Sequence, residues 1–151
     1  MRKDQTKPVT DPEQSFALFD TYVRFWLKPL ALHQWMVELH WSDADDGWAA
    51  CEADVKYKRA VVTVHPAQLA KEQFTPLQIE SIAIHELTHG IIWPGYNEIA
   101  NPQIPEEVRS YFEEIAADQL AHSLLMAKYK SAPEVETLWQ GYKVVRPEKP
   151  Q

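Results

Sequence analysis

The chain has 151 residues, of which 45% are apolar and 25% are charged, close to the averages for soluble globular domains. That length predicts one domain with a sizeable core, and the single cysteine, Cys51, excludes an internal disulfide framework. The formal net charge of −7 argues against a nucleic-acid-binding protein. The polar N-terminus and the lack of a long apolar run argue against secretion and membrane insertion, so we expect a cytoplasmic protein.

The first expected element is a helix that follows a flexible N-terminus, residues 1–10. Asp11 is a suitable N-cap residue, and Pro12 suits the first helical turn. Apolar residues then recur at helical spacing as far as Trp26, and Pro29 should stop the helix. The chain should therefore begin with one amphipathic helix.

Three strands are expected next, because apolar and polar residues begin to alternate. The first strand covers about residues 33–41. Asp46-Gly47 is a strong signal for a hairpin into a second strand over residues 48–57, and a third, more apolar strand follows at residues 60–65. We expect a mainly antiparallel sheet, in which the third strand could pair with an extended peptide if it lies at the edge.

The rest of the chain is expected to be helical. A capping-box pattern at Thr75–Gln78 predicts a helix to about Ile92. A long helix should cover residues 105–130, and a short helix at residues 134–142 should precede a flexible tail, residues 143–151. This order of helices and strands predicts an α+β fold.

The clearest chemical signal is the sequence His-Glu-Leu-Thr-His within the first of these later helices. His85 and His89 are four residues apart, so they project from one helix face at a spacing that suits two ligands of one zinc ion. Glu86 is rotated away from that face but could reach a metal-bound water. Two hydrogen-bonded structural histidines are the alternative, yet Glu86 is the only charged side chain within residues 81–92, and a buried charge is costly unless something satisfies it.

A catalytic zinc site needs a third protein ligand, and the long helix offers candidates. Glu114 and Asp118 share one helix face, so Glu114 could ligate the metal while Asp118 orients a ligand histidine. Glu113 should point about 100° away from that face. His122 remains a second candidate for the third ligand, and a solvated charge stripe remains the structural alternative for Glu114 and Asp118.

This combination, H-E-x-x-H followed on a later helix by E-x-x-x-D, resembles the pattern of gluzincin metallopeptidases, the thermolysin-like enzymes in the broad sense. The size of the chain and its segment 114–121 are also similar to the minimal ImmA/IrrE-type metallopeptidases of phages and mobile elements. The resemblance covers about residues 60–130 and implies one zincin-like metallopeptidase domain over residues 11–142. The matching positions are His85, Glu86, His89, Glu114 and Asp118.

The sequence therefore predicts a zinc metallopeptidase with one Zn²⁺ per chain and a peptide or protein substrate of narrow specificity. The metal ligands would be His85, His89 and Glu114, with Asp118 behind one of the histidines. Glu86 would act as general base toward the metal-bound water.

Two questions stay open at the level of the sequence. The donor that would stabilise the oxyanion could be Tyr96, Tyr111 or His122. The competing hypothesis for the whole protein is a zinc-binding sensor or regulatory module that keeps the fold and the metal without cleaving peptides. A phage-type peptidase acting on cell wall or on a virion protein is a further alternative.

Overall fold

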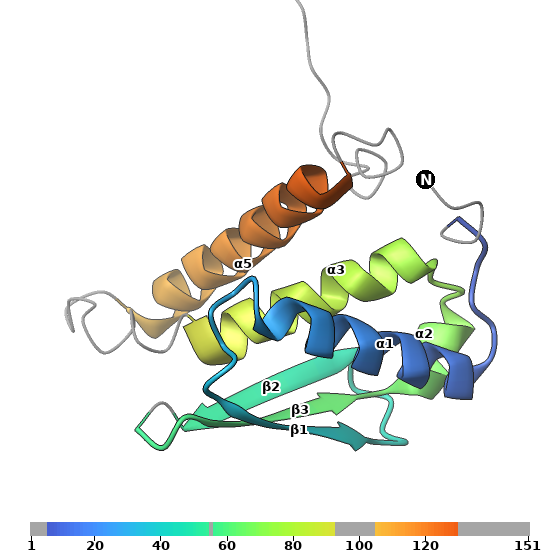
Figure 1. The fold of residues 1–151 in the computed structure, drawn as a ribbon, viewed down its shortest axis with the longest axis horizontal. Helices are drawn as coiled ribbons and strands as arrows, with labels where there is room; N and C mark the ends of the chain where they lie inside the picture. Colours follow the sequence, from blue (N-terminus) through green and yellow to red (C-terminus); the bar gives the residue numbers. More distant parts are fainter. Residues whose placement is uncertain (1–5, 55, 93–104, 130–151) are drawn as a thin grey trace, which may run out of the picture.

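The computed structural model describes residues 6–54, 56–92 and 105–129 as a sheet with helices packed against one face (Figure 1). The predicted α+β class is confirmed. The predicted short helix at 134–142 and the predicted tail lie outside the described residues. In chain order the elements are α1 (Pro12–Leu27), β1 (Met36–Trp41), β2 (Ala49–Asp54), β3 (Arg59–Val64), α2 (Pro66–Lys71), α3 (Pro76–Leu87), the π-helical turn η2 (Thr88–Ile92) and α5 (Glu106–Tyr129).

Helix α1 begins where the sequence predicts. The Asp11 side chain caps it by accepting a hydrogen bond from the backbone N–H of Glu13 at 3.2 Å, and a proline occupies its first turn. The segment before it, which was expected to be flexible, is anchored at Val9. That side chain is buried, and its backbone N–H donates to the carbonyl of Phe74 at 2.9 Å. The described part of the N-terminal segment is thus tied to the start of α3.

The sheet is mixed, with strand order β1-β3-β2. β1 runs parallel to β3, and β2 runs antiparallel to it. Two predictions are therefore wrong. The sheet is not mainly antiparallel, and Asp46-Gly47 does not form a hairpin between neighbouring strands, because the chain crosses the end of β3 on its way from β1 to β2.

The central place belongs to β3, so the expectation that residues 60–65 could form an edge is also wrong. The physical reason is burial. β3 turns Ala60, Val62 and Val64 into the core, and such an apolar strand is best paired on both sides. β1 and β2 alternate half-buried with exposed positions, and charged side chains such as Glu38 and Glu52 suit exposed edge strands.

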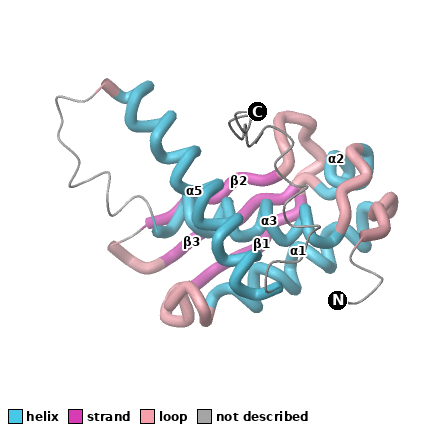
Figure 2. The backbone as a smooth tube through the Cα atoms, turned by 90° about the horizontal axis from the view of Figure 1, so that it is seen from above, coloured by secondary structure: helices cyan, strands magenta, loops and turns pink. Residues whose placement is uncertain are grey.

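Helices α1 and α3 cover one face of the sheet, and α5 crosses α3 on the side away from the sheet (Figures 1 and 2). The short helix α2 was not predicted, because six residues without a side-chain cap give too weak a local signal. Within the described ranges, no helix is both long and apolar enough to cross a lipid bilayer. The largest fully buried apolar side chains are Phe19, Leu69, Ile79, Ile84, Leu87 and Leu125.

Helix α3 has the predicted capping box. The Thr75 hydroxyl accepts from the backbone N–H of Gln78 at 3.3 Å, and the Gln78 side chain accepts from the Thr75 backbone N–H at 2.9 Å. Its continuation to Ile92 is a π-helical turn that brings Gly90 against β2. A Cβ on Gly90 would lie 2.2 Å from Sγ of Cys51, so only glycine fits there.

Candidate metal centre

The two histidines of the motif lie at the junction of α3 and η2. Their ring centroids are 5.6 Å apart with the planes nearly perpendicular, at 83°. The side chains are 20% exposed for His85 and 31% exposed for His89. Both rings are thus partly sheltered but still within reach of solvent.

Helix α5 brings Glu114 to this pair. Its Oε1 lies 2.8 Å from Nε2 of His89, and its Oε2 lies 3.5 Å from Nε2 of His85. One ligand atom from each of the three residues lies within 4.8 Å of the others. Two imidazoles and one carboxylate are a donor set that zinc favours, and these atoms are close enough to converge on one ion. The carboxylate is half-exposed, so one side of the site is open.

Behind the ligand nitrogens, each histidine meets a second carboxylate of α5. Asp118 lies where the sequence predicts, with its Oδ1 2.8 Å from Nδ1 of His85. Glu113 does not point away from the site, which corrects the prediction. Its Oε1 lies 2.6 Å from Nδ1 of His89, and its side chain is only 12% exposed. Because a carboxylate only accepts, Asp118 and Glu113 both favour a proton on Nδ1. The other ring nitrogen, Nε2, faces Glu114 and is the one that could bind a metal.

Glu113 was missed because helix periodicity fixes directions only relative to the helix that carries the residues. α5 crosses α3, so the Glu113 and Glu114 carboxylates reach opposite nitrogens of the same His89 ring from neighbouring positions. The only indication in the sequence is that Glu113 is the neighbour of the candidate ligand Glu114. Which histidine Glu113 contacts is decided by the way α5 crosses α3.

Glu86 lies under the histidines with only 8% of its surface exposed. Burial is the main reason that the pKa of its carboxyl is raised, and the charge of Glu114 adds to it, while His85 and His89 act in the opposite direction. The pKa of His89 is also raised. Desolvation lowers it, but the hydrogen bond to Glu113 and the charge of Glu114 outweigh that effect.

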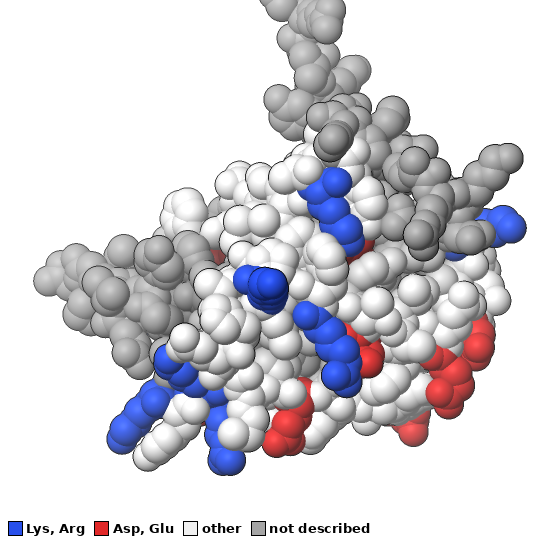
Figure 3. Space-filling view, viewed as in Figure 1, with Lys and Arg blue, Asp and Glu red and all other residues white. Residues whose placement is uncertain are grey.

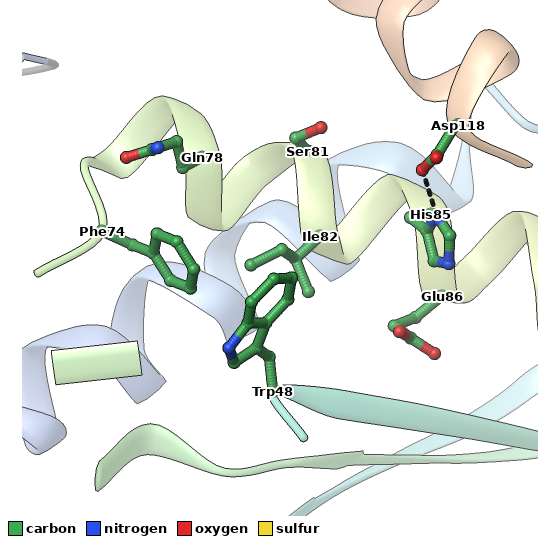
Figure 4. A pocket seen from close by; sticks show the side chains of 8 residues that line it. All are labelled: Trp48, Phe74, Gln78, Ser81, Ile82, His85, Glu86 and Asp118. Carbon is green, nitrogen blue, oxygen red and sulfur yellow. Dashed lines mark hydrogen bonds and ion pairs between the residues drawn. The ribbon is translucent and has the colours of Figure 1, made fainter. Parts of the chain in front are cut away.

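A pocket of about 310 Å³ opens beside Glu86 and runs along α3 (Figure 4). Trp48 and Phe74 meet edge to face at its far end, with centroids 5.0 Å apart, and Ile82 faces them. The pocket thus joins an apolar end to the polar side chains of His85, Glu86 and Asp118, and this combination of apolar and polar groups is typical of ligand sites. Its lining residues are Trp48, Phe74, Gln78, Ser81, Ile82, His85, Glu86 and Asp118.

The predicted oxyanion donors are not gathered at this pocket. Tyr96 lies outside the described residues. Tyr111 is 66% exposed, and its ring contacts Phe112. His122 is half-buried on α5 but belongs neither to the pocket lining nor to the three-residue ligand group, which contains Glu114 instead.

The surface around these elements has mixed charge. On the face shown in Figure 3, basic and acidic side chains lie among wide uncharged areas.

No protein-family model, curated protein or solved structure matches this chain. The geometry defines a candidate metal centre for one ion, formed by His85, His89 and Glu114. The resemblance to gluzincins therefore rests on the sequence motif and on these three residues alone.

Proposed function

We propose that this protein is a zinc-dependent metallopeptidase of the gluzincin type. The observation that carries the proposal is the convergence of His85, His89 and Glu114 next to the buried carboxylate of Glu86. A group of three metal-binding side chains would also serve a zinc sensor that catalyses no reaction. A nearly buried carboxylate beside them is costly without a task, because glutamine would pack as well without the charge.

The role of each residue follows from its position. A zinc ion held by the three ligands would lower the pKa of its bound water to about 7 and polarise a peptide carbonyl. Glu86 would accept the proton of that water and return it to the leaving amine. Asp118 and Glu113 would hold the two histidines in the ligating tautomer.

Substrate binding is expected along the pocket and β2. The apolar end formed by Trp48, Phe74 and Ile82 suits an aliphatic or aromatic side chain beside the cleaved bond. Since β3 is central, the edge that could pair with an extended peptide near the site is that of β2. Its Cys51 packs against Gly90, the neighbour of the ligand His89.

A second candidate, a zinc sensor without catalysis, is favoured by one observation. Glu114 is 51% exposed, so the ligand group lies near the surface of the described part of the chain. Such a site could report zinc or a bound partner without processing a peptide.

The deciding experiment compares wild type, Glu86→Gln and Glu13→Gln on a peptide library, with cleavage read by mass spectrometry. Glu13 is an exposed glutamate of α1 outside the pocket lining and away from β2, so its replacement controls for loss of one charge. All three proteins should bind one zinc and melt at higher temperature with zinc than after chelation. Only Glu86→Gln should lose cleavage, by about 10²–10⁴-fold. Equal cleavage by wild type and Glu86→Gln contradicts the enzyme, and zinc binding without any cleavage favours the sensor.

A further inference from the structure

A second cluster of charged and aromatic side chains lies at the other end of the α3–α5 contact. Its centre is Glu80 of α3, whose side chain is fully buried. One carboxylate oxygen of Glu80 accepts from the indole N–H of Trp26 at 2.8 Å and from the ammonium of Lys128, and the other accepts from the hydroxyl of Tyr129 at 2.6 Å. Three helices therefore meet at one carboxylate.

Aromatic rings enclose the partner of this carboxylate. The Lys128 ammonium lies 4.2 Å from the ring centroid of Phe25, 5.0 Å from that of Tyr129 and 5.6 Å from those of Tyr22 and Trp26. A cation over aromatic faces is attracted by them, most strongly where water is excluded. The ion pair is thus well satisfied, and removing one partner would leave an unpaired charge in an apolar setting.

Most of the apolar contact of α5 lies in its C-terminal half. Along its 24 residues only Ala117, Ala121 and Leu125 are buried, and Leu124, Met126 and Tyr129 are partly buried against the core. Near its N-terminal end, Tyr111 and Phe112 are 66% and 60% exposed. Hydrophobic burial therefore does little to hold the N-terminal half of α5, which carries Glu113 and Glu114, in place on α3.

Polar contacts at two separate places help to fix the position of α5 on α3. At one place Glu113, Glu114 and Asp118 meet the histidines. At the other, about 15 Å further along the helix axis, Lys128 meets Glu80. Two fixed points separated in this way determine how a rigid helix lies on its neighbour.

We propose that Glu80 and Lys128 form a latch that positions α5 on α3, so that Glu114 stands opposite the two histidines. Both are positioning residues, since neither touches the ligand group. The proposal rests on the metal centre proposed above. It adds that zinc affinity depends on an ion pair remote from the zinc.

The test compares Lys128→Met, which keeps an apolar side chain against the rings, with Val62→Ala. Val62 is fully buried in β3, so its truncation lowers stability without touching α5. Zinc affinity is measured by competition with a chelator, well below both melting temperatures, and the ligand set is read from the visible spectrum of the Co²⁺-substituted protein. Lys128→Met should bind zinc about 10-fold or more weakly and change the Co²⁺ spectrum, whereas Val62→Ala should do neither.

A measurement without metal separates the latch from the metal centre. In metal-free protein, hydrogen exchange of residues 113–118 should be faster in Lys128→Met than in Val62→Ala. If Lys128→Met does not fold, the double variant Glu80→Gln/Lys128→Met removes both charges and should fold with the same loosened segment. A wild type that binds no zinc refutes the metal centre but leaves this exchange difference expected. Equal exchange in the latch variant and in Val62→Ala, or equal zinc affinity and Co²⁺ spectrum, overturns the latch.

Discussion

Oδ1 of Asp118 lies 2.8 Å from Nδ1 of His85, on the opposite side of the ring from the nitrogen that faces Glu114. One imidazole therefore connects two carboxylates of the same helix, one as a partner in the candidate ligand group and one as a support behind it. Because Asp118 and Glu114 contact different nitrogens of His85, the role of Asp118 can be tested without replacing the candidate ligand Glu114.

Asp118→Asn should weaken zinc binding by about 10–100-fold, because a neutral amide holds the Nδ1 proton of His85 less strongly than a carboxylate does. Competition with a chelating dye measures the affinity. Glu107→Gln is the control, since Glu107 is exposed on the same helix and its replacement removes the same charge. An Asp118→Asn affinity equal to that of Glu107→Gln would contradict the assigned support.

Glu113→Gln should have an effect of the same order through the other histidine, as Glu113 meets Nδ1 of His89 at 2.6 Å. Because His85 and His89 lie 5.6 Å apart and both contact Glu114, the effect of the double variant Glu113→Gln/Asp118→Asn on zinc affinity should differ from the product of the two single effects. A titration of the single and double variants with zinc decides this. No loss in Glu113→Gln would mean that its contact with His89 has no influence on the metal.

Gly90→Ala should destabilise the fold by at least about 1–3 kcal/mol, the usual cost of overpacking. The added Cβ would lie 2.2 Å from Sγ and 2.4 Å from Cβ of Cys51. Urea unfolding measures the loss. Adding Cys51→Gly removes both of these atoms and should recover part of the stability, while an unchanged free energy of unfolding in Gly90→Ala would contradict the close approach of η2 and β2.

The Cys51 thiol should be unreactive near neutral pH. Burial raises its pKa from 9.0 to about 12, and the charges of Glu86 and Glu52 add to the shift. Alkylation by iodoacetamide at pH 8 should be much slower in native protein than in urea-unfolded protein, which serves as the reference. Equal rates would show that the thiol is not shielded.

The same shift predicts a pH dependence of stability. Because the folded-state pKa of Cys51 is higher than the ordinary value, its contribution is complete below about pH 9.0 and is lost as the pH rises toward about 12. In Cys51→Ala, the free energy of unfolding should therefore fall less between about pH 9.0 and about pH 12 than it does in wild type.

Trp48→Ala should raise KM for a substrate with an aromatic or aliphatic side chain beside the cleaved bond, with a smaller change in kcat. Trp48 forms the apolar end of the pocket together with Phe74. Trp41→Ala is the matched control, because Trp41 packs on Phe16 and does not line the pocket. Equal KM values for the two variants would exclude the pocket as the place where that side chain binds.

The parts of the molecule that could be predicted from the sequence are those set by local spacing. The capping box at Thr75, the histidine pair and the shared face of Glu114 and Asp118 depend only on helix geometry, and the structure has all of them. What could not be predicted depends on contacts between distant segments. Asp46-Gly47 is a good local turn signal, but the apolar strand β3 lies between β1 and β2 and pairs with both. The segment that contains this turn therefore does not connect two neighbouring strands.

The latch residues show the same limit. In the sequence, Glu80 lies near the start of one helix and Lys128 near the end of another, where solvated charged residues are common. No local pattern in the sequence indicates that these two residues form an ion pair. Their contact exists only because α3 and α5 cross where the rings of α1 exclude water. Packing between elements therefore decides both the support of His89 by Glu113 and the place of this ion pair.

The mixed sheet has a consequence for how the chain reaches this state. β2 and β3 are joined by a short turn and pair antiparallel, so they can associate early as a local hairpin. β1 pairs in parallel with β3, from Met36 opposite Arg59 to Trp41 opposite Val64, and it has to close a longer loop before it can add. During synthesis β1 leaves the ribosome before β3, so it has no partner until β3 has been made. Until β1 pairs with β3, the valines of β3 stay on an open edge, and we expect aggregation of the nascent chain to begin at that edge.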